Sequence, residues 1–153
     1  MRTSTIVCDS TLAVDALLRP DGPSGRLVRR FLERREFDLV LSGPLLEEIR
    51  RAATDPKVLA RLELSVAEVE RWVVSLGVLA TLVGVEHDED RTGPETDDDP
   101  VLVAAAAVGE AVVVTLDPEL LAKPATGAFE AVRPEVLLEV LEAQAESSAS
   151  RAV

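Results

Sequence analysis

The sequence predicts an α/β fold, in which helices flank a central parallel sheet of four to five strands. The candidate strands are short, continuous apolar runs, as expected for strands that are buried on both faces. Helical patterns separate these runs, and this alternation of strand and helix is typical of a parallel sheet. With 153 residues, 47% of them hydrophobic, the chain suits one domain with a single core.

Proline, glycine and capping residues mark where the expected helices begin and end. Ser65 starts one helix, because Glu68 three residues later completes a capping box. Pro100 occupies the first position of another, and Gly109 lies just beyond its end. The expected strands are 5–8, 39–41, 81–83, 111–115 and 129–132, and the expected helices are 12–18, 25–35, 44–53, 65–79, 100–108 and one that begins at Pro134.

Two segments do not fit this pattern of strands and helices. Residues 86–99 hold eight acids and one arginine with little apolar content, which predicts a loop. The last residues, 143–153, are polar and predict a frayed tail. The sequence therefore predicts one domain over residues 1–142.

Composition limits the environment and the partners of the chain. The single cysteine, Cys8, excludes an internal disulfide and fits a reducing compartment. No signal peptide and no apolar run of about 18 residues is present, which predicts a cytoplasmic protein without a membrane partner. The net charge of −12 opposes nucleic acid binding in general, but residues 1–35 hold seven arginines and only four acids. The arginines of the helix over 25–35 either approach a polyanion or simply solvate the helix.

The predicted topology brings several carboxylates to one edge of the sheet. Asp9 directly follows the first strand, and Asp117 follows the fourth within two residues. Crossover helices begin at the same edge, so Glu48 lies about one turn into one helix, and Asp98 and Asp99 lie at the start of another. In such a sheet, ligands collect outside the carboxyl ends of the strands.

Each of these acids also has a purely structural interpretation. Asp99 before Pro100 is most simply a helix N-cap, and Asp117 before Pro118 is a second candidate cap. Glu48 reads equally as an exposed helix acid and Asp9 as a turn residue. Their convergence favours a shared ligand, because unneutralised carboxylates raise one another's pKa. Mg²⁺ or Mn²⁺ suits such oxygen ligands, whereas one histidine and one cysteine make zinc a poor choice.

Four segments, "IVCDSTLAVDALL", "LVLSGPLLEEIRRA", "DDDPVLVAAAAVG" and "VVVTLDPELL", resemble in order and spacing the PIN-domain ribonucleases. The resemblance covers residues 6 to 141 and is strongest to the bacterial group related to toxins of toxin–antitoxin pairs. It implies a PIN-like three-layer fold. Carried over position by position, it implies that the catalytic and metal-binding acids are Asp9, Glu48, Asp98 and Asp117.

The resemblance also implies an activity and partners. These are Mg²⁺- or Mn²⁺-dependent hydrolysis of single-stranded RNA, an antitoxin protein and a homodimer. The apolar residues of the helices over 12–18 and 66–79 exceed what one small core needs, which also favours a homodimer. One departure is that Thr11 stands where the family usually has asparagine, although a hydroxyl at this position can still support Asp9 or hold a water.

Three other classes of protein compete with a nuclease. A haloacid-dehalogenase-like phosphatase needs a second acid two residues after the first, and Thr11 occupies that position. A receiver domain needs paired acids after its first strand, where this chain has Asp9-Ser10. The alternative that stays open is a catalytically weak or inactive PIN-like module that binds protein or RNA, favoured by Thr11 and by the acidic composition.

Overall fold

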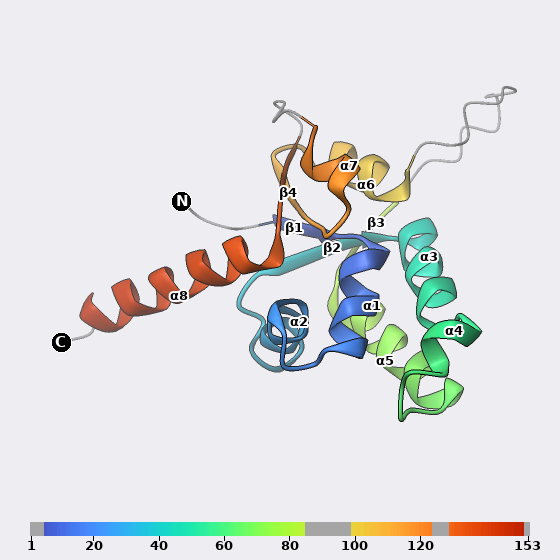
Figure 1. The fold of residues 1–153 in the computed structure, drawn as a ribbon. Coiled ribbons are helices and arrows are strands. Elements are labelled where there is room, and N and C mark those ends of the chain that lie inside the picture. The colour runs from blue at the N-terminus through green and yellow to red at the C-terminus, as the bar shows by residue number, and fades with distance from the viewer. Residues whose placement is uncertain (1–4, 85–98, 124–128, 152–153) are drawn as a thin grey trace, which may run out of the picture.

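The computed structural model describes residues 5–84, 99–123 and 129–151, and its centre is one five-stranded sheet (Figure 1). The strands follow the order β3-β2-β1-β4-β5, and each neighbouring pair is parallel. This arrangement confirms the predicted parallel sheet and its upper strand number. The strands are β1 (Thr5–Cys8), β2 (Asp38–Ser42), β3 (Thr81–Val83), β4 (Ala111–Val114) and β5 (Phe129–Val132).

Helices cover both faces of the sheet, which gives the three layers of a PIN-like fold. In Figure 1, α1, α2 and α5 lie on one side of the sheet, and α6 and α7 lie on the other. No helix of the described residues is long and apolar enough to cross a membrane. The helices of these residues are α1 (Ser10–Leu18), α2 (Pro23–Arg34), α3 (Gly43–Ala53), α4 (Pro56–Leu59), α5 (Val66–Leu79), α6 (Pro100–Val108), α7 (Pro118–Leu121) and α8 (Pro134–Arg151).

Local capping explains why several helices begin where they do. The Glu68 N–H donates to the Ser65 hydroxyl at 3.2 Å, and that hydroxyl donates in turn to the Glu68 carboxylate, so the predicted start of α5 is confirmed. The short α4 was not predicted, although Asp55 caps it and Pro56 opens it. The same Asp-Pro pair opens α6 and α7, so the signal for α4 was present in the sequence.

The C-terminal segment differs from the predicted frayed tail. Helix α8 continues to Arg151, about nine residues past the boundary expected at residue 142. Its first half packs on the domain through buried Leu137, Leu138 and Leu141. The rest projects away from the body (Figure 1). Alanine, glutamine and glutamate in this half are strong helix formers, and they continue the helix without a buried face.

The core is built mainly from aliphatic side chains, as the composition requires. Ile6 and Val7 of β1 and Val113 and Val114 of β4 are all almost completely buried, which confirms that these central strands are covered on both faces. Ala104 and Ala105 of α6 are also fully buried, and α6 contacts β1, β2, β3 and β4. Small side chains on α6 let this helix lie close to the sheet.

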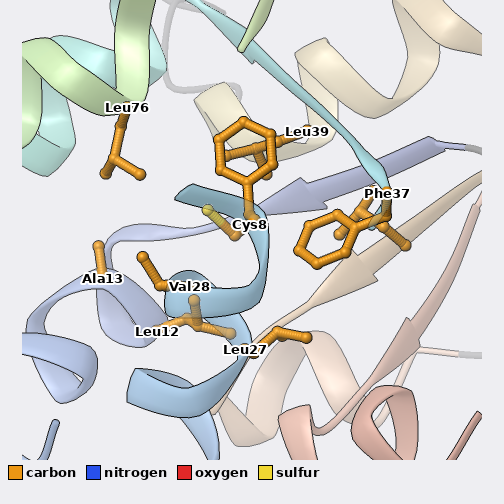
Figure 2. Close-up of a pocket in the computed structure, with 10 residues that line it drawn as sticks. Cys8, Leu12, Ala13, Leu27, Val28, Phe37, Leu39 and Leu76 are labelled. Atoms are coloured by element: carbon orange, nitrogen blue, oxygen red, sulfur yellow. The ribbon is translucent and has the colours of Figure 1, made fainter. Parts of the chain in front are cut away.

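A small cavity of about 10 Å³ remains between the sheet and α1, α2 and α5. Figure 2 shows the apolar side chains around it, with Cys8 of β1 among them. Burial raises the pKa of the Cys8 thiol to about 12, and the charge of neighbouring Asp9 acts in the same direction. A cavity with this lining offers a ligand no polar contact, so it is a packing void and not a binding site.

We expect Cys8 to be inert in the folded protein, because the thiolate is the reactive form and burial suppresses it. Iodoacetamide at neutral pH should alkylate Cys8 only at the rate at which the chain unfolds, and should label it rapidly in denaturant. Mass spectrometry of the time course measures both rates. Native labelling as fast as that of a free thiol would contradict the buried position of Cys8.

Candidate functional site

The described acids Asp9, Glu48, Asp99 and Asp117 lie at the edge of the sheet where the order of the strands reverses. From β1 the chain builds β2 and β3 on one side, and it then returns to build β4 and β5 on the other. Ligands of open α/β sheets bind outside the carboxyl ends of the strands at such a point. Cys8 pairs with Val114, so the next residues along each strand, Asp9 and Thr115, lie side by side.

Asp9 is a buried carboxylate, 5% exposed, that is held by three hydrogen bonds. Its Oδ1 accepts from the Thr11 hydroxyl at 2.7 Å and from the Leu12 N–H at 3.2 Å. Its Oδ2 accepts from the hydroxyl of fully buried Thr115. The bond from Leu12 makes Asp9 the N-cap of α1, so the structural interpretation of Asp9 holds together with its place in the cluster.

Thr11 and Thr115 also bind the turn that follows β4. The Thr11 hydroxyl oxygen accepts from the Leu116 N–H at 3.2 Å, and the Thr115 hydroxyl oxygen accepts from the Asp117 N–H at 2.9 Å. Each threonine therefore donates to Asp9 and accepts from the chain that carries Asp117. We call these two residues the threonine pair.

Glu48 and its neighbour Glu47 occupy different environments on α3. Glu47 accepts from Arg50 at 2.8 Å and from Arg51 at 3.2 Å, and its hydrogen bond with Arg50 lowers the pKa of Glu47 to about 2. Both glutamates are half-buried, but the pKa of Glu48 is raised, first by burial and then by the charges of Asp99 and Asp9. The structure thus directs Glu48, and not Glu47, toward the other acids.

Asp99 and Asp117 are both helix caps, as their positions before proline predicted. Asp99 Oδ1 accepts from the Val101 N–H at 3.1 Å at the start of α6. Asp117 Oδ1 accepts from the Glu119 N–H at 2.9 Å at the start of α7. Asp98, the expected third acid of the site, lies outside the described residues. Asp99 is therefore the described acid of this segment that acts on Glu48.

Helix N-termini offset part of the repulsion in this cluster. Asp9, Asp99 and Asp117 each stand at the N-terminus of a helix, where the backbone N–H groups and the helix dipole favour negative charge. In each case a backbone N–H of the helix donates to Oδ1 of the capping carboxylate, and Oδ2 takes no part in this bond. A carboxylate can therefore cap its helix and still offer an oxygen to a second partner.

Burial raises the pKa values of two of these acids, and repulsion from neighbouring carboxylates adds to the rise. Burial raises the pKa of Asp9 above its ordinary value, and the charge of Asp117 adds to this. Hydrogen bonds from Thr115, Thr11 and the Leu12 N–H oppose the rise. Because burial also raises the pKa of Glu48, both groups are harder to ionise than free carboxylates and gain most from a nearby cation.

The donor set suits a hard divalent cation, although the ligands are not drawn together. Carboxylate oxygens are what Mg²⁺ and Mn²⁺ bind. Over residues 5–84, 99–123 and 129–151, however, no three Asp, Glu, His or Cys side chains are arranged to hold a metal ion. The hydrogen bonds of Asp99 and Asp117 to their own helices hold them in the capping position. A cation would therefore be held by Asp9 and Glu48 first, with the caps or Asp98 supplying further oxygen.

The arginines of α2 do not form a free positive surface. Arg26, Arg29, Arg30 and Arg34, with Glu33, line one hollow of about 200 Å³. Each of the four has a carboxylate partner, for example Glu142 of α8 at 3.1 Å from Arg26. Arginines that form surface ion pairs keep the outer face of α2 soluble. This favours the interpretation that they solvate the helix over the one in which they approach a polyanion.

Sequence reasoning did not assign Thr115 a part in the site. The Thr115 side chain is nevertheless fully buried, and its hydroxyl donates to Asp9. A hydroxyl at the end of an apolar strand, next in register to an acid, is the signal that points to such a contact.

We expect Mg²⁺ to stabilise the protein more at about pH 7.5 than at about pH 5. In the metal-free protein, the folded pKa values of Asp9 and Glu48 lie above the ordinary values of 3.8 and 4.5. Their contribution to the free energy of unfolding therefore falls as the pH rises from those values through the raised ones. A cation favours the ionised forms, so its effect grows over the same window. Free ligand at 100 times its Kd adds about 2.7 kcal/mol.

Thermal unfolding with Mg²⁺ and with EDTA measures this difference at both pH values. Asp9→Asn and Glu48→Gln should reduce the gain in Tm, and Glu47→Gln, the matched control on the same helix turn, should keep it. An equal gain in all four proteins would show that Mg²⁺ binds elsewhere.

Comparison with known proteins gives one match. No curated protein and no solved structure matches the chain significantly. Residues 5–119 match the family model of the PIN domain, a nuclease-type fold whose members typically use divalent metals. The match runs from β1 into α7 and includes Asp9, Glu48 and Asp117. Because it covers most of the 153 residues, the chain belongs to the PIN domain family.

Proposed function

We propose that this protein is a cytoplasmic, Mg²⁺- or Mn²⁺-dependent endoribonuclease that hydrolyses single-stranded RNA. The observation that carries the proposal is the position of Asp9. This buried, hydrogen-bonded carboxylate lies at the switch point of a PIN-domain sheet. The charge of Asp117 raises the pKa of Asp9, and the charge of Asp9 in turn raises the pKa of Glu48. A buried carboxylate with a raised pKa, placed beside further acids, is typical of functional sites and is what a metal-dependent hydrolase needs.

Phosphodiester hydrolysis needs charge stabilisation and an activated water more than a covalent nucleophile. A bound divalent cation would supply the Lewis acid and lower the pKa of a coordinated water. In this chain, Asp9 Oδ2 and the Glu48 carboxylate would hold that cation, together with Asp117 and with Asp98 or Asp99.

We propose further that the protein is the toxin component of a toxin–antitoxin pair, held inactive by an antitoxin protein. This role rests on the resemblance of the four sequence segments to toxin-like PIN domains. The second candidate, an inactive PIN-like binding module, loses one of its supports. Thr11, the departure that favoured it, donates to Asp9 and thus keeps the first acid in place.

We propose a homodimer that forms through α5, and not through both α1 and α5 as the sequence suggested. The apolar residues of α1, among them Leu12, Ala13, Ala16 and Leu17, are buried in the core of their own chain and leave no surplus for a partner. Helix α5 does leave a surplus. Val74 and Val78 lie one turn apart and are 60% and 74% exposed, and Leu82 on the edge strand β3 is 55% exposed.

Light scattering should therefore give the mass of two chains, and Val78→Asp should give the mass of one, because a charge in an apolar interface is costly. Val136→Asp is the matched control, since Val136 is 46% exposed on α8, away from α5. It should leave the dimer intact. A single-chain mass for the wild-type protein at every concentration would contradict the dimer.

We expect purified protein with Mn²⁺ to cleave single-stranded RNA, and EDTA to stop the reaction. Glu48→Gln and Asp9→Asn should each lower kcat/KM about 100-fold or more, since about 3 kcal/mol of charge stabilisation corresponds to that factor. Glu47→Gln should change it little, because Glu47 pairs with Arg50 and Arg51 at the surface. Gel analysis of a labelled oligonucleotide measures all four rates.

Two results would overturn the nuclease proposal. One is RNA that stays intact with Mg²⁺ and with Mn²⁺ at every protein concentration. The other is a Glu48→Gln variant as active as the wild-type protein, since contamination would then explain the cleavage. RNA binding without cleavage would support the binding module.

A further inference from the structure

Thr11 lies at the junction between the first and fourth acids of the candidate site. Its hydroxyl donates to Asp9 Oδ1 at 2.7 Å and accepts from the Leu116 N–H at 3.2 Å. These contacts connect the first turn of α1 with the turn between β4 and α7, 105 residues later. The sequence departs from the family pattern at this position, so the contact belongs to this chain and cannot be carried over from the resemblance.

The oxygens of Asp9 are almost fully used. An ionised carboxylate accepts about four hydrogen bonds, two on each oxygen. Oδ1 accepts from Thr11 and Leu12, and Oδ2 accepts from Thr115. Among the hydrogen bonds of the described residues, one acceptor position therefore remains unused, and it lies on Oδ2. Thr11 and Leu12 both donate to Oδ1, and they thereby leave Oδ2 as the oxygen that can bind a further partner.

We infer that Thr11 is a positioning residue that turns Asp9 so that Oδ2 is presented to the cation, and that fixes Asp9 relative to the Asp117 turn. The inference rests on the proposed function, since it assigns a role within the same site. Leu12 cannot replace Thr11 here, because its N–H contacts only Asp9 Oδ1 and makes no bond to the turn after β4. Thr115 donates to Asp9 Oδ2 and accepts from the Asp117 N–H. These bonds stay when Thr11 is replaced, so we expect the variant to fold and to lose only the contacts of Thr11.

Thr11→Val removes the hydroxyl and keeps the shape of the side chain, whereas Thr11→Ser keeps the hydroxyl. We expect Thr11→Val to weaken Mn²⁺ binding about tenfold, within the range for partners that orient a metal ligand, and Thr11→Ser to stay within about twofold of wild type. In RNA cleavage, Thr11→Val should lower kcat and leave KM unchanged, because Thr11 acts through Asp9. Thr54→Val is the matched control, since the Thr54 hydroxyl donates to the Arg50 carbonyl at the far end of α3.

Titration calorimetry with Mn²⁺, in the absence of RNA, measures the Mn²⁺ affinities of the wild-type protein and of its Thr11 variants. A double-mutant cycle of Thr11→Val and Asp9→Ala, with Tm measured in EDTA, gives the coupling between the Thr11 hydroxyl and the Asp9 carboxylate without metal. Non-additive shifts in Tm are expected. Additive shifts, or equal weakening of Mn²⁺ binding by Thr11→Val and Thr11→Ser, would overturn the role of the hydroxyl.

The outcomes separate this inference from the proposed function. If the wild-type protein and Thr11→Val bind Mn²⁺ and cleave RNA equally well, the positioning role fails and the nuclease stands. If the wild-type protein neither binds Mn²⁺ nor cleaves RNA, the proposed function fails, and the positioning role fails with it because there is no cation to orient toward. Loss of Mn²⁺ affinity in Thr11→Val, with rescue in Thr11→Ser, supports both.

Discussion

The hydrogen bonds that hold one buried negative charge, on Asp9, link most of the structure around the site. Moving a carboxylate out of water is unfavourable unless its oxygens are bonded. The chain meets this requirement with the Leu12 N–H of its own helix and with the hydroxyls of Thr11 and Thr115. These bonds join β1, α1 and the turn after β4 at the switch point of the sheet. They stabilise the ionised form only in part, since burial still raises the pKa of Asp9.

Capping and ligand binding are compatible uses of the same carboxylate in this fold. Sequence reasoning treated them as competing interpretations of Asp99 and Asp117. In the structure the caps of α1, α6 and α7 each bond through one oxygen, and the other oxygen lies outside the cap. Parallel strands with crossover helices place several helix N-termini at one edge, so the fold itself concentrates such caps there. Helix dipoles then reduce the free energy needed to keep the acids close together.

The fold could be predicted because its signals are local. Continuous apolar runs gave the strands, and residues such as Ser65 and Pro100 gave the starts of helices. The choice of Glu48 over Glu47 required the family pattern, because adjacent glutamates on a helix differ only in which neighbours they face. Thr115 was missed because its contact joins residues 106 positions apart, and no local pattern reports such a contact. Helix α8 extended further than expected because helix propensity continues it where no packing does.

The pairing of β1 with β4 has a consequence for the time at which the site forms. Asp9 and Thr115 meet only through this long-range contact, and the loop that it closes contains β2, β3 and six helices of the described chain. Pairs so distant in sequence form after the local contacts, because closing a long loop costs entropy. During synthesis, the segment that carries Asp9 and Glu48 emerges first and lacks its fourth acid. Asp117 therefore joins Asp9 and Glu48 only after about three quarters of the chain has been made, when β4 can insert beside β1.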